Sequence, residues 1–216
     1  MSRSHAASAT LPTGLRTPQQ ARSRRTRERI LEAAVAAFER GGYDETTTAA
    51  IAARAGVGVG TLYAWFPDKR AILLEILGAT VNKISEHVVQ SLVPERWREG
   101  DPRAHLRAVI EAVFGAREFS PGIQRILWER FFKDPEFRAA VQRIEHRVRE
   151  AIETLLASLA AEGRIRALDP HAAAFVIHTS VEWTASRLVL GDGGVPTADA
   201  VETMTDMVGR FLFDAR

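Results

Sequence analysis

The sequence predicts an all-α protein with about nine helices, and three observations lead to that fold class. From residue 22 almost to the end of the chain, apolar residues recur at steps of three and four, which is the period of an α-helix. No stretch shows the strict alternation of a half-buried strand, and no βαβ pattern is present. Four Asp-Pro or Ser-Pro pairs stand at positions typical of helix starts.

The first expected helix has Ile30, Ala34 and Phe38 on one face. Gly41-Gly42 would end it, because glycine readily adopts the left-handed conformation of a helix C-terminus. Later helices are expected to begin at Asp101-Pro102, Ser120-Pro121, Asp134-Pro135 and Asp169-Pro170. In each pair the first side chain caps free N–H groups, and the proline occupies a position where its missing N–H costs nothing.

Three later segments carry a clear apolar stripe. One runs from Phe137 to Leu159, another from Leu106 to Phe114, and the last from Val201 to Phe211. Each stripe repeats with the helical period, so each segment is expected to bury one face against the rest of the molecule.

Composition excludes several classes of protein. The 216 residues include no cysteine, so neither a disulfide framework nor a thiolate metal site can form. No stretch approaches the roughly 18 uninterrupted apolar residues of a membrane span. Residues 1–21 lack the apolar centre of a secretory signal. We interpret residues 1–21 as a disordered arm and expect a cytoplasmic protein that has no membrane association and no cofactor.

Positive charge is concentrated in the first third of the chain. Residues 1–80 carry 11 Lys and Arg against 7 Asp and Glu, whereas residues 81–216 carry 18 against 20. The densest run is ARSRRTRERI, residues 21–30, with five arginines and one glutamate. Such a run is typical both of a solvated helix start and of a surface that binds a polyanion. A single helix is expected over residues 72–93, across the change in charge, so the two parts are expected to be mechanically joined.

The stretch AGVGVGTLYAWFPDK, residues 55–69, has glycines at 56, 58 and 60, as a phosphate-binding loop would. A dinucleotide loop needs Gly-x-Gly-x-x-Gly after a strand. Here the third glycine comes one residue early, and the preceding TTTAAIAARA has a helical period. No Gly-Lys-Ser/Thr follows, so a Walker loop is excluded as well. The glycines need another explanation.

A helix-turn-helix explains them. Ile51 and Ala55 would face the core from the first helix, and Gly56 would make the left-handed turn. Val57 and Leu62 would fill the junction between the two helices.

The second helix of this motif would point several side chains outward. Hydroxyl groups on Thr61 and Tyr63 are expected to be exposed, where a hydroxyl can bond a phosphate oxygen. Val59 could touch a thymine methyl group in the major groove. The pattern therefore favours a surface that binds duplex DNA.

Residues 26–74 resemble the DNA-binding domain of the tetracycline-repressor (TetR) family. The similar segments are AAFERGGYDETTT, IAARAGV and GTLYAWFPDK, in the family's order and spacing. The chain departs from the family pattern at Gly58, where a serine cap is common, and at Val59, where a lysine is common. Glycine in place of a serine cap costs only a few tenths of a kcal/mol, whereas the missing lysine removes one possible DNA contact per subunit.

The resemblance implies a helix-turn-helix DNA-binding domain over residues 22–67 and a ligand-binding and dimerisation domain over residues 68–216. Phosphate contacts are implied for Thr48, Tyr63 and Lys69, with Thr47 as the cap of the second helix. The groove-facing positions are occupied by Val59, Gly60, Thr61, Ala64 and Trp65.

The family also implies a homodimer in which the last two helices of each subunit form a four-helix bundle, while the other helices enclose a small-molecule pocket. In this sequence HAAAFVIHTSVEWTASRLVL, residues 171–190, intersperses small residues among large apolar ones, which permits close helix approach. An intramolecular core helix is the alternative interpretation. As residues of the pocket we expect Phe114, Trp128, Thr179 and Trp183.

A metal site is not predicted. His171, His178 and Glu182 are seven and four residues apart and could share a helix face. Nothing nearby supplies a third strong ligand. The favoured interpretation is that His171 lies beside a helix cap and that His178 and Glu182 form a polar pair at the dimer seam.

Together these features predict a transcriptional repressor that binds palindromic double-stranded DNA as a homodimer. A small, largely apolar inducer would release it by shifting the helix over residues 68–93. Two alternatives stay open. The same domain could serve a chromosome-organising or partner-controlled factor without an inducer, which a solid core in the second domain would indicate. The other alternative is a helical enzyme in which His87, His146 or His178 acts as the base. No serine, carboxylate pair or metal-binding cluster at suitable spacing supports an enzyme.

Overall fold

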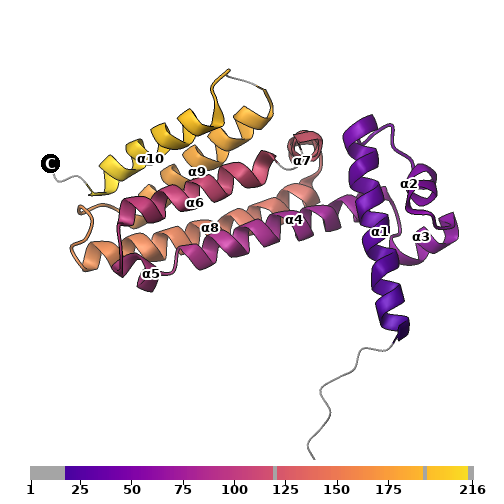
Figure 1. The fold of residues 1–216 in the computed structure, drawn as a ribbon, viewed down its shortest axis with the longest axis horizontal. Coiled ribbons are helices and arrows are strands. Elements are labelled where there is room, and N and C mark those ends of the chain that lie inside the picture. The colour runs from indigo at the N-terminus through magenta and orange to yellow at the C-terminus, as the bar shows by residue number, and fades with distance from the viewer. Residues whose placement is uncertain (1–17, 119–120, 192–193, 214–216) are drawn as a thin grey trace, which may run out of the picture.

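A computed structural model describes residues 18–118, 121–191 and 194–213, and these are all-α, as the periodicity predicts (Figure 1). Ten helices lie within these ranges: α1 Pro18–Gly41, α2 Thr48–Ala55, α3 Val59–Trp65, α4 Lys69–Ser91, α5 Pro94–Arg98, α6 Pro102–Glu118, α7 Pro121–Lys133, α8 Pro135–Ala161, α9 Pro170–Val189 and α10 Thr197–Phe213. The short α5 was not expected. In the described ranges no helix has the length and apolar character that a bilayer span requires.

The four helices predicted to start at a proline begin there, at Pro102, Pro121, Pro135 and Pro170. The Asp134 carboxylate accepts hydrogen bonds from the N–H groups of Glu136 and Phe137, at 3.0 and 3.1 Å. Asp169 caps α9 in the same way. Ser120, the cap expected for α7, lies outside the described residues, as does most of the arm over residues 1–21. Helix α1 begins at Pro18, inside that arm, since proline suits the first turn of a helix.

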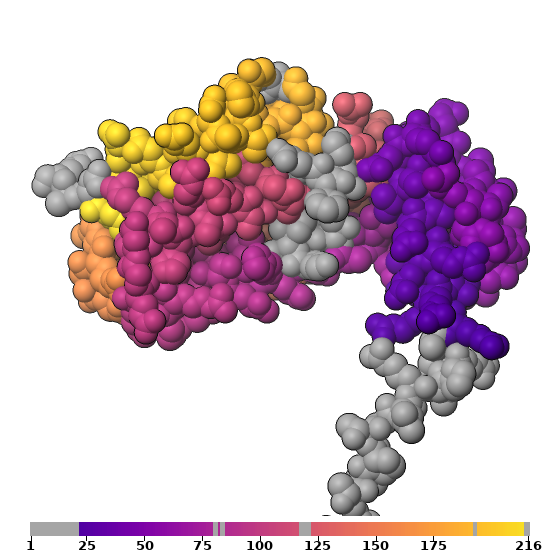
Figure 2. Space-filling model, viewed as in Figure 1, coloured from indigo at the N-terminus to yellow at the C-terminus, as the bar shows by residue number. Residues whose placement is uncertain are grey.

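The helices form an elongated bundle with a lobe at one end (Figure 1). In the bundle α4 and α8 run side by side, and α8 also packs against α9, while α6 packs against α10. Helices α1, α2 and α3 form the lobe, which stands out from the bundle in the space-filling view (Figure 2). Helix α4 leads from the lobe into the bundle, so it is the bridging helix that the sequence predicted.

Buried side chains form two cores. The N-terminal core combines residues of α1 to α4 with Ile123, Ile126 and Leu127 of α7 and Phe137 of α8. The C-terminal core lies among α4 to α6 and α8 to α10. The N-terminal core therefore extends past residue 67, because α7 returns from later in the chain to close it.

Candidate nucleic-acid interface and ligand cavity

Helices α2 and α3 meet at the predicted turn. Thr47 caps α2 by accepting a hydrogen bond from the N–H of Ala50 at 3.1 Å. Gly56 ends the helix in the left-handed region, with φ 62° and ψ 40°. The N–H of Val57 then donates to the carbonyl of Ala52 at 3.0 Å. Because side chains rarely tolerate this φ, the glycine has a backbone role and not a phosphate-binding one.

Arg29 of α1 holds this turn from outside. Its guanidinium donates to the carbonyl oxygens of Ala55 and Gly56. A Cβ atom at position 56 would lie 2.7 Å from Nη2 of Arg29, so a larger residue there would displace the end of this side chain from the turn. In the same basic run Arg27 pairs with Glu75 of α4. Two of the five arginines that suggested polyanion binding thus have structural partners, which sequence spacing alone did not indicate.

One face of α3 is open to solvent. Val59 is 41% exposed and Tyr63 is 51% exposed. The neighbouring residues Gly60, Thr61 and Ala64, also predicted to contact DNA, are exposed as well. Leu62 is fully buried and anchors the helix. Trp65 is half-buried against the N-terminal core, so only part of its ring faces outward.

Two hydroxyl groups meet at the edge of this face. The hydroxyls of Thr48, the first residue of α2, and Tyr63 of α3 are 3.0 Å apart. Each hydroxyl has one proton and two lone pairs, so one proton remains to be donated outward when the pair is formed. The pair lies at an exposed position and has the chemistry to bond a phosphate oxygen.

Lys69, the third predicted phosphate contact, is held by the loop before α2. Its ammonium donates to the carbonyl oxygens of Tyr43 and Asp44, at 2.6 and 3.1 Å, and lies 4.3 Å from the centre of the Tyr43 ring. An ammonium group has three N–H donors, so one remains for a phosphate. The sequence did not indicate this second role of Lys69.

A polar junction ties the lobe to the bundle. Arg130 of α7 donates to both carboxylate oxygens of Asp44 at 2.8 Å, and its guanidinium lies 4.4 Å from the centre of the Tyr43 ring. Burial raises the pKa of the Tyr43 phenol, although Arg130 opposes that shift. The cation therefore faces a ring that stays neutral.

A second ion pair lies beside this junction. Arg70 of α4 donates to the two carboxylate oxygens of Asp134 at 2.6 and 2.8 Å, and to Glu136 at 2.7 Å. The hydrogen bonds from Arg70 hold the pKa of Asp134 well below its usual range. Because α4 leaves the lobe at this point, the pair fixes the start of α4 to the start of α8.

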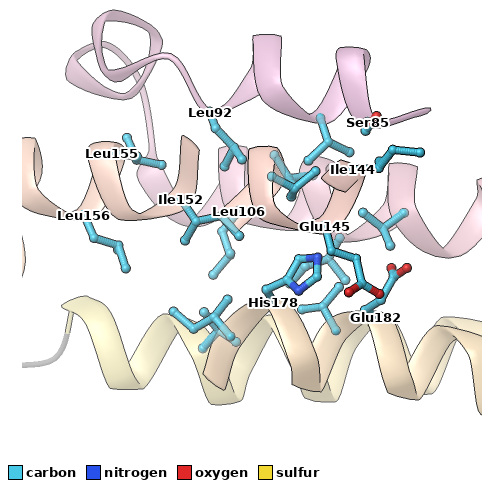
Figure 3. Close-up of a pocket in the computed structure, with 18 of the residues that line it drawn as sticks. Ser85, Leu92, Leu106, Ile144, Glu145, Ile152, Leu155, Leu156, His178 and Glu182 are labelled. Atoms are coloured by element: carbon cyan, nitrogen blue, oxygen red, sulfur yellow. The ribbon is translucent and has the colours of Figure 1, made fainter. Parts of the chain in front are cut away.

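The C-terminal core surrounds a cavity of about 150 Å³. Aliphatic side chains of α4, α6, α8, α9 and α10 form most of its wall, among them Leu92, Leu106 and Ile152 (Figure 3). A mostly apolar wall with few polar groups is the usual composition of a small-molecule site.

Polar groups gather at one part of the cavity. Glu145 of α8 points toward His178 and Glu182 of α9 (Figure 3). Ser85 and Gln124 also line the cavity, and both are buried. The sequence had placed His178 and Glu182 at the dimer seam, which the structure corrects: the pair faces inward because Val181, between them, belongs to the buried stripe of α9. His178 and Glu182 are four residues apart and lie beside the buried stripe of α9. This spacing was the sequence signal that could have placed them on the inward face of the helix.

Of the four pocket residues expected from the sequence, only Trp128 lines this cavity. Phe114 is buried in the C-terminal core but is not part of the cavity wall. Thr179 and Trp183 are exposed, because each follows an inward-facing residue and one step along a helix turns a side chain by about 100°. Trp183 nevertheless touches Trp128, with ring centres 5.1 Å apart.

His171 lies apart from the cavity. It is exposed and its ring contacts the carboxylate of Glu153 at 3.0 Å, which raises the pKa of the imidazole. Across the described ranges, no group of three or more His, Asp or Glu side chains has an arrangement suited to a metal ion.

Helices α9 and α10 expose apolar side chains on the outside of the bundle. Phe175 is 52% exposed and Trp183 is 46% exposed on α9, and Val176, Met207 and Phe211 are exposed beside them in the sequence of α9 and α10. Where such side chains form a contiguous patch, they mark a protein–protein contact.

Models of two protein families match the chain. The family described as bacterial regulatory proteins, tetR family, matches residues 30–76, which hold the helix-turn-helix. The family described as BetI-type transcriptional repressor, C-terminal, matches residues 102–212. The second match alone covers about half of the chain and includes the cavity helices α6 to α10.

Curated relatives match only part of their length. The HTH-type transcriptional repressor KstR of Mycobacterium tuberculosis is 41% identical over 70 residues, which are 32% of this chain and 32% of that protein. The chain spans less than half the length of the curated relatives that it matches first.

Solved structures match over most of the chain. A transcriptional regulator from Saccharomonospora viridis in complex with choline has a TM-score of 0.73 and 21% identity, and the match covers 88% of this chain and 98% of that one. The regulator FadR from Bacillus subtilis in complex with stearoyl-CoA has a TM-score of 0.69 and 20% identity, covering 84% and 96%. At this identity the likeness shows the fold alone.

Proposed function

We propose that this chain, which belongs to the TetR family of bacterial regulatory proteins and carries a BetI-type C-terminal domain, is a repressor that a small molecule releases from palindromic DNA. Its family is one of transcription regulators and not of enzymes. The observation that carries the proposal is the exposed face of α3, which presents its side chains from an anchored helix on a lobe that stands out from the bundle (Figure 2).

In this proposal α3 enters the major groove. Val59 and Thr61 meet base edges, where an aliphatic group can contact a thymine methyl and a hydroxyl can bond either base of a pair. Gly60 and Ala64 let the helix backbone approach closely, and the exposed edge of Trp65 borders the contact. These are the groups that would select a sequence.

Phosphate contacts fix the orientation of the helix. The paired hydroxyls of Thr48 and Tyr63 and the remaining N–H donor of Lys69 would supply these contacts. The cap residue Thr47 orients the start of α2, whose free N–H groups attract an anion. Such contacts hold the protein on DNA of any sequence.

We further propose a homodimer that forms through the exposed apolar faces of α9 and α10. One helix-turn-helix makes few contacts, whereas two on a twofold axis read half-sites about one helical turn apart. Phe175 and Trp183 supply aromatic area of the kind that dominates such interfaces.

The ligand would act through α4. Ser85 and Val88 of α4 line the cavity, and the first residue of the same helix, Lys69, is bonded to the loop before α2. A displacement of α4 at the cavity is therefore transmitted to the helix-turn-helix. A ligand that favours the released state by 100-fold supplies about 2.7 kcal/mol. The cavity also favours this function over that of a chromosome-organising factor without an inducer, for which a solid core is expected.

The two similar structures hold different ligands, choline in one and stearoyl-CoA in the other. Their identity to this chain is too low to transfer either ligand. The chemistry of the ligand has to come from the cavity itself.

Selection of bound fragments from random duplex DNA by the purified protein tests the proposal. We expect a palindromic consensus with half-sites one helical turn apart. The Thr61→Val variant should change the selected consensus, whereas Tyr63→Phe should weaken binding to every sequence. A collection of fragments without a twofold consensus would count against the proposed repressor.

A further inference from the structure

We infer that Arg22 and Arg25, on one face of α1, form a second DNA contact that binds the phosphate backbone outside the half-site read by α3. This inference rests on the proposed function, because it adds a contact to the same protein–DNA complex. It follows from the exposure of the first turns of α1, the face on which these arginines lie and the direction of the helix.

The first turns of α1 extend beyond the N-terminal core. Ile30 is buried, but none of residues 22–29 is. The helix nevertheless continues past α2 and α3 at its N-terminal end (Figure 1). Ordering such an extension costs conformational entropy, and little packing offsets that cost. Its side chains are open to a binding partner.

Arg22 and Arg25 lie on the face of α1 that meets the helix-turn-helix. Arg29 identifies this face, because it donates to the carbonyl oxygens of Ala55 and Gly56 in the turn between α2 and α3. At about 100° per residue, Arg22 and Arg25 lie within about 40° of Arg29 around the helix axis. They continue the same face about 6 to 10 Å beyond Arg29.

Arg24, the other arginine of the basic run without a structural role, lies on a different face. It is about 140° from Arg29 around the axis and about 60° from Arg27. Arg27 pairs with Glu75 of α4 on the side away from the turn. Only Arg22 and Arg25 therefore extend the surface of the helix-turn-helix.

The charge and chemistry of these two side chains suit a phosphate. Arg22 and Arg25 are exposed, and in the described part of the chain no carboxylate pairs with either. A guanidinium can donate two parallel hydrogen bonds to phosphate oxygens. With α3 in a major groove about 12 Å wide, side chains about 6 to 10 Å beyond the turn reach the phosphate strand that borders the groove.

The direction of α1 assigns the contact to the ends of the bound DNA. In Figure 1 the N-terminal end of α1 points away from α9 and α10. In a homodimer joined through those two helices, the arginines of each subunit lie on the outer side of its half-site. This contact requires duplex beyond the palindrome, whereas the contact of α3 does not.

The salt dependence of DNA binding tests the contact. The probe is a selected palindrome extended at each end by one helical turn, about 10 base pairs, with binding of the full chain followed by fluorescence anisotropy. Each phosphate contact contributes about 0.9 to the slope of log affinity against log salt, and each arginine acts twice in a homodimer. Arg22→Gln and Arg25→Gln should therefore each flatten the slope by about 1.8. The double variant should flatten it by about 3.6 and bind at least tenfold more weakly at about 100 mM salt.

Arg24→Gln is the matched control. It removes the same charge from the same part of α1 but from another face, and should change the slope by less than about 0.5. Glutamine is as good a helix former as arginine, so thermal unfolding without DNA should be the same for all variants. The double variant should select the same consensus as the parent, because phosphate contacts do not read bases.

The length of the DNA provides a second test. Trimming the probe to the palindrome should weaken binding of the parent at least tenfold. The same trimming should weaken binding of the double Arg22→Gln and Arg25→Gln variant less than threefold, because that variant has already lost the outer contact.

Four outcomes would overturn the inference. They are an unchanged slope in the double variant, an equal effect of Arg24→Gln, an equal loss on trimming for parent and double variant, and a changed consensus. The proposed function fails separately. A parent that selects no palindrome contradicts the repressor, whereas a parent that binds its palindrome with any of these four outcomes contradicts only the contact of α1.

Discussion

The two cores of this protein differ in how they are filled. In the N-terminal core the large side chains of Phe38, Ile51 and Leu62 are almost completely buried directly beneath the helix-turn-helix. The C-terminal core has a similar apolar composition but encloses the cavity. A dense core holds α3 in one orientation, while a core with an internal space can accept a ligand and respond to it. Under the proposed function, the chain gives up dense packing only where a ligand needs room.

Helix α7 belongs to both regions. Ile123 and Ile126 pack in the N-terminal core, while Gln124 and Trp128 line the cavity. A Cβ atom on Gly122 would lie 3.0 Å from the backbone of Glu39 in α1, so the two helices are in close contact. In the proposed mechanism, a change at the cavity would therefore reach the lobe by α7 as well as by α4.

Truncating one leucine in each core tests the contrast most strongly. Leu62→Ala should lower the free energy of unfolding by about 4 kcal/mol, because a fully enclosed side chain loses contacts on every side. Leu155→Ala, at the cavity wall, should cost about 2 kcal/mol, because one side of this leucine already faces empty space. Urea unfolding at one protein concentration measures both. Equal losses would mean that the two cores are packed alike.

Alanine at two glycines of the helix-turn-helix should have opposite effects. Gly56→Ala should destabilise the protein by about 1–2 kcal/mol, because position 56 has a positive φ. A clash with Arg29 would add to the loss. Gly60→Ala should stabilise it by about 0.5–1 kcal/mol, since position 60 is helical and a Cβ there meets no atom within 4 Å. Thermal unfolding of the protein without DNA compares the pair, and a stabilising Gly56→Ala would refute the role given to the turn.

The contact of α7 with the lobe is tested by a double-mutant cycle. Val148→Phe partly fills the cavity and should change the affinity for a selected DNA fragment about tenfold. In an Arg130→Met background, which lacks the bond to Asp44, the same substitution should change it about threefold or less. Lys133→Met, whose ion pair stays within α7, is the control and should preserve the full effect. Additive effects of Val148→Phe and Arg130→Met would exclude Arg130 from the coupling.

The smallest expected effect concerns the ion pair between Arg70 and Asp134. The folded pKa of Asp134 is depressed, so its contribution is present above the unfolded pKa of about 3.9 and is lost as the pH falls through the folded value. Asp134→Asn keeps a capping oxygen but not the charge, and should cost about 1 kcal/mol between pH 5 and 8.

Thermal unfolding from pH 8 to pH 2 measures this difference. The two proteins should become closer in stability below about pH 4. Asp206→Asn, in an exposed pair with Arg210 on α10, should cost less than about 0.5 kcal/mol. A constant difference between Asp134→Asn and the parent over the whole range would exclude the charge as its cause.

Much of the DNA-binding surface could be predicted because its determinants are local. The cap at Thr47, the left-handed Gly56 and the burial of Leu62 all follow from neighbours within a few residues, and the structure has each of them. The DNA contacts themselves stay predictions. The cavity was harder to predict. Trp128 was expected there, whereas Glu145 was not considered and Thr179 and Trp183 point elsewhere.

The sequence by itself determined most of the helices, the proline-marked starts of four of them and the bend between α2 and α3, because hydrogen bonds and caps of a helix are made within one or two turns. Only the tertiary structure decided which side chains line the cavity and which partners Arg29 and Arg130 find. Those contacts join residues far apart in the chain, and they depend on how each helix is rotated about its axis. An error of one residue turns a side chain by about 100°, which is enough to move it from the cavity to the solvent.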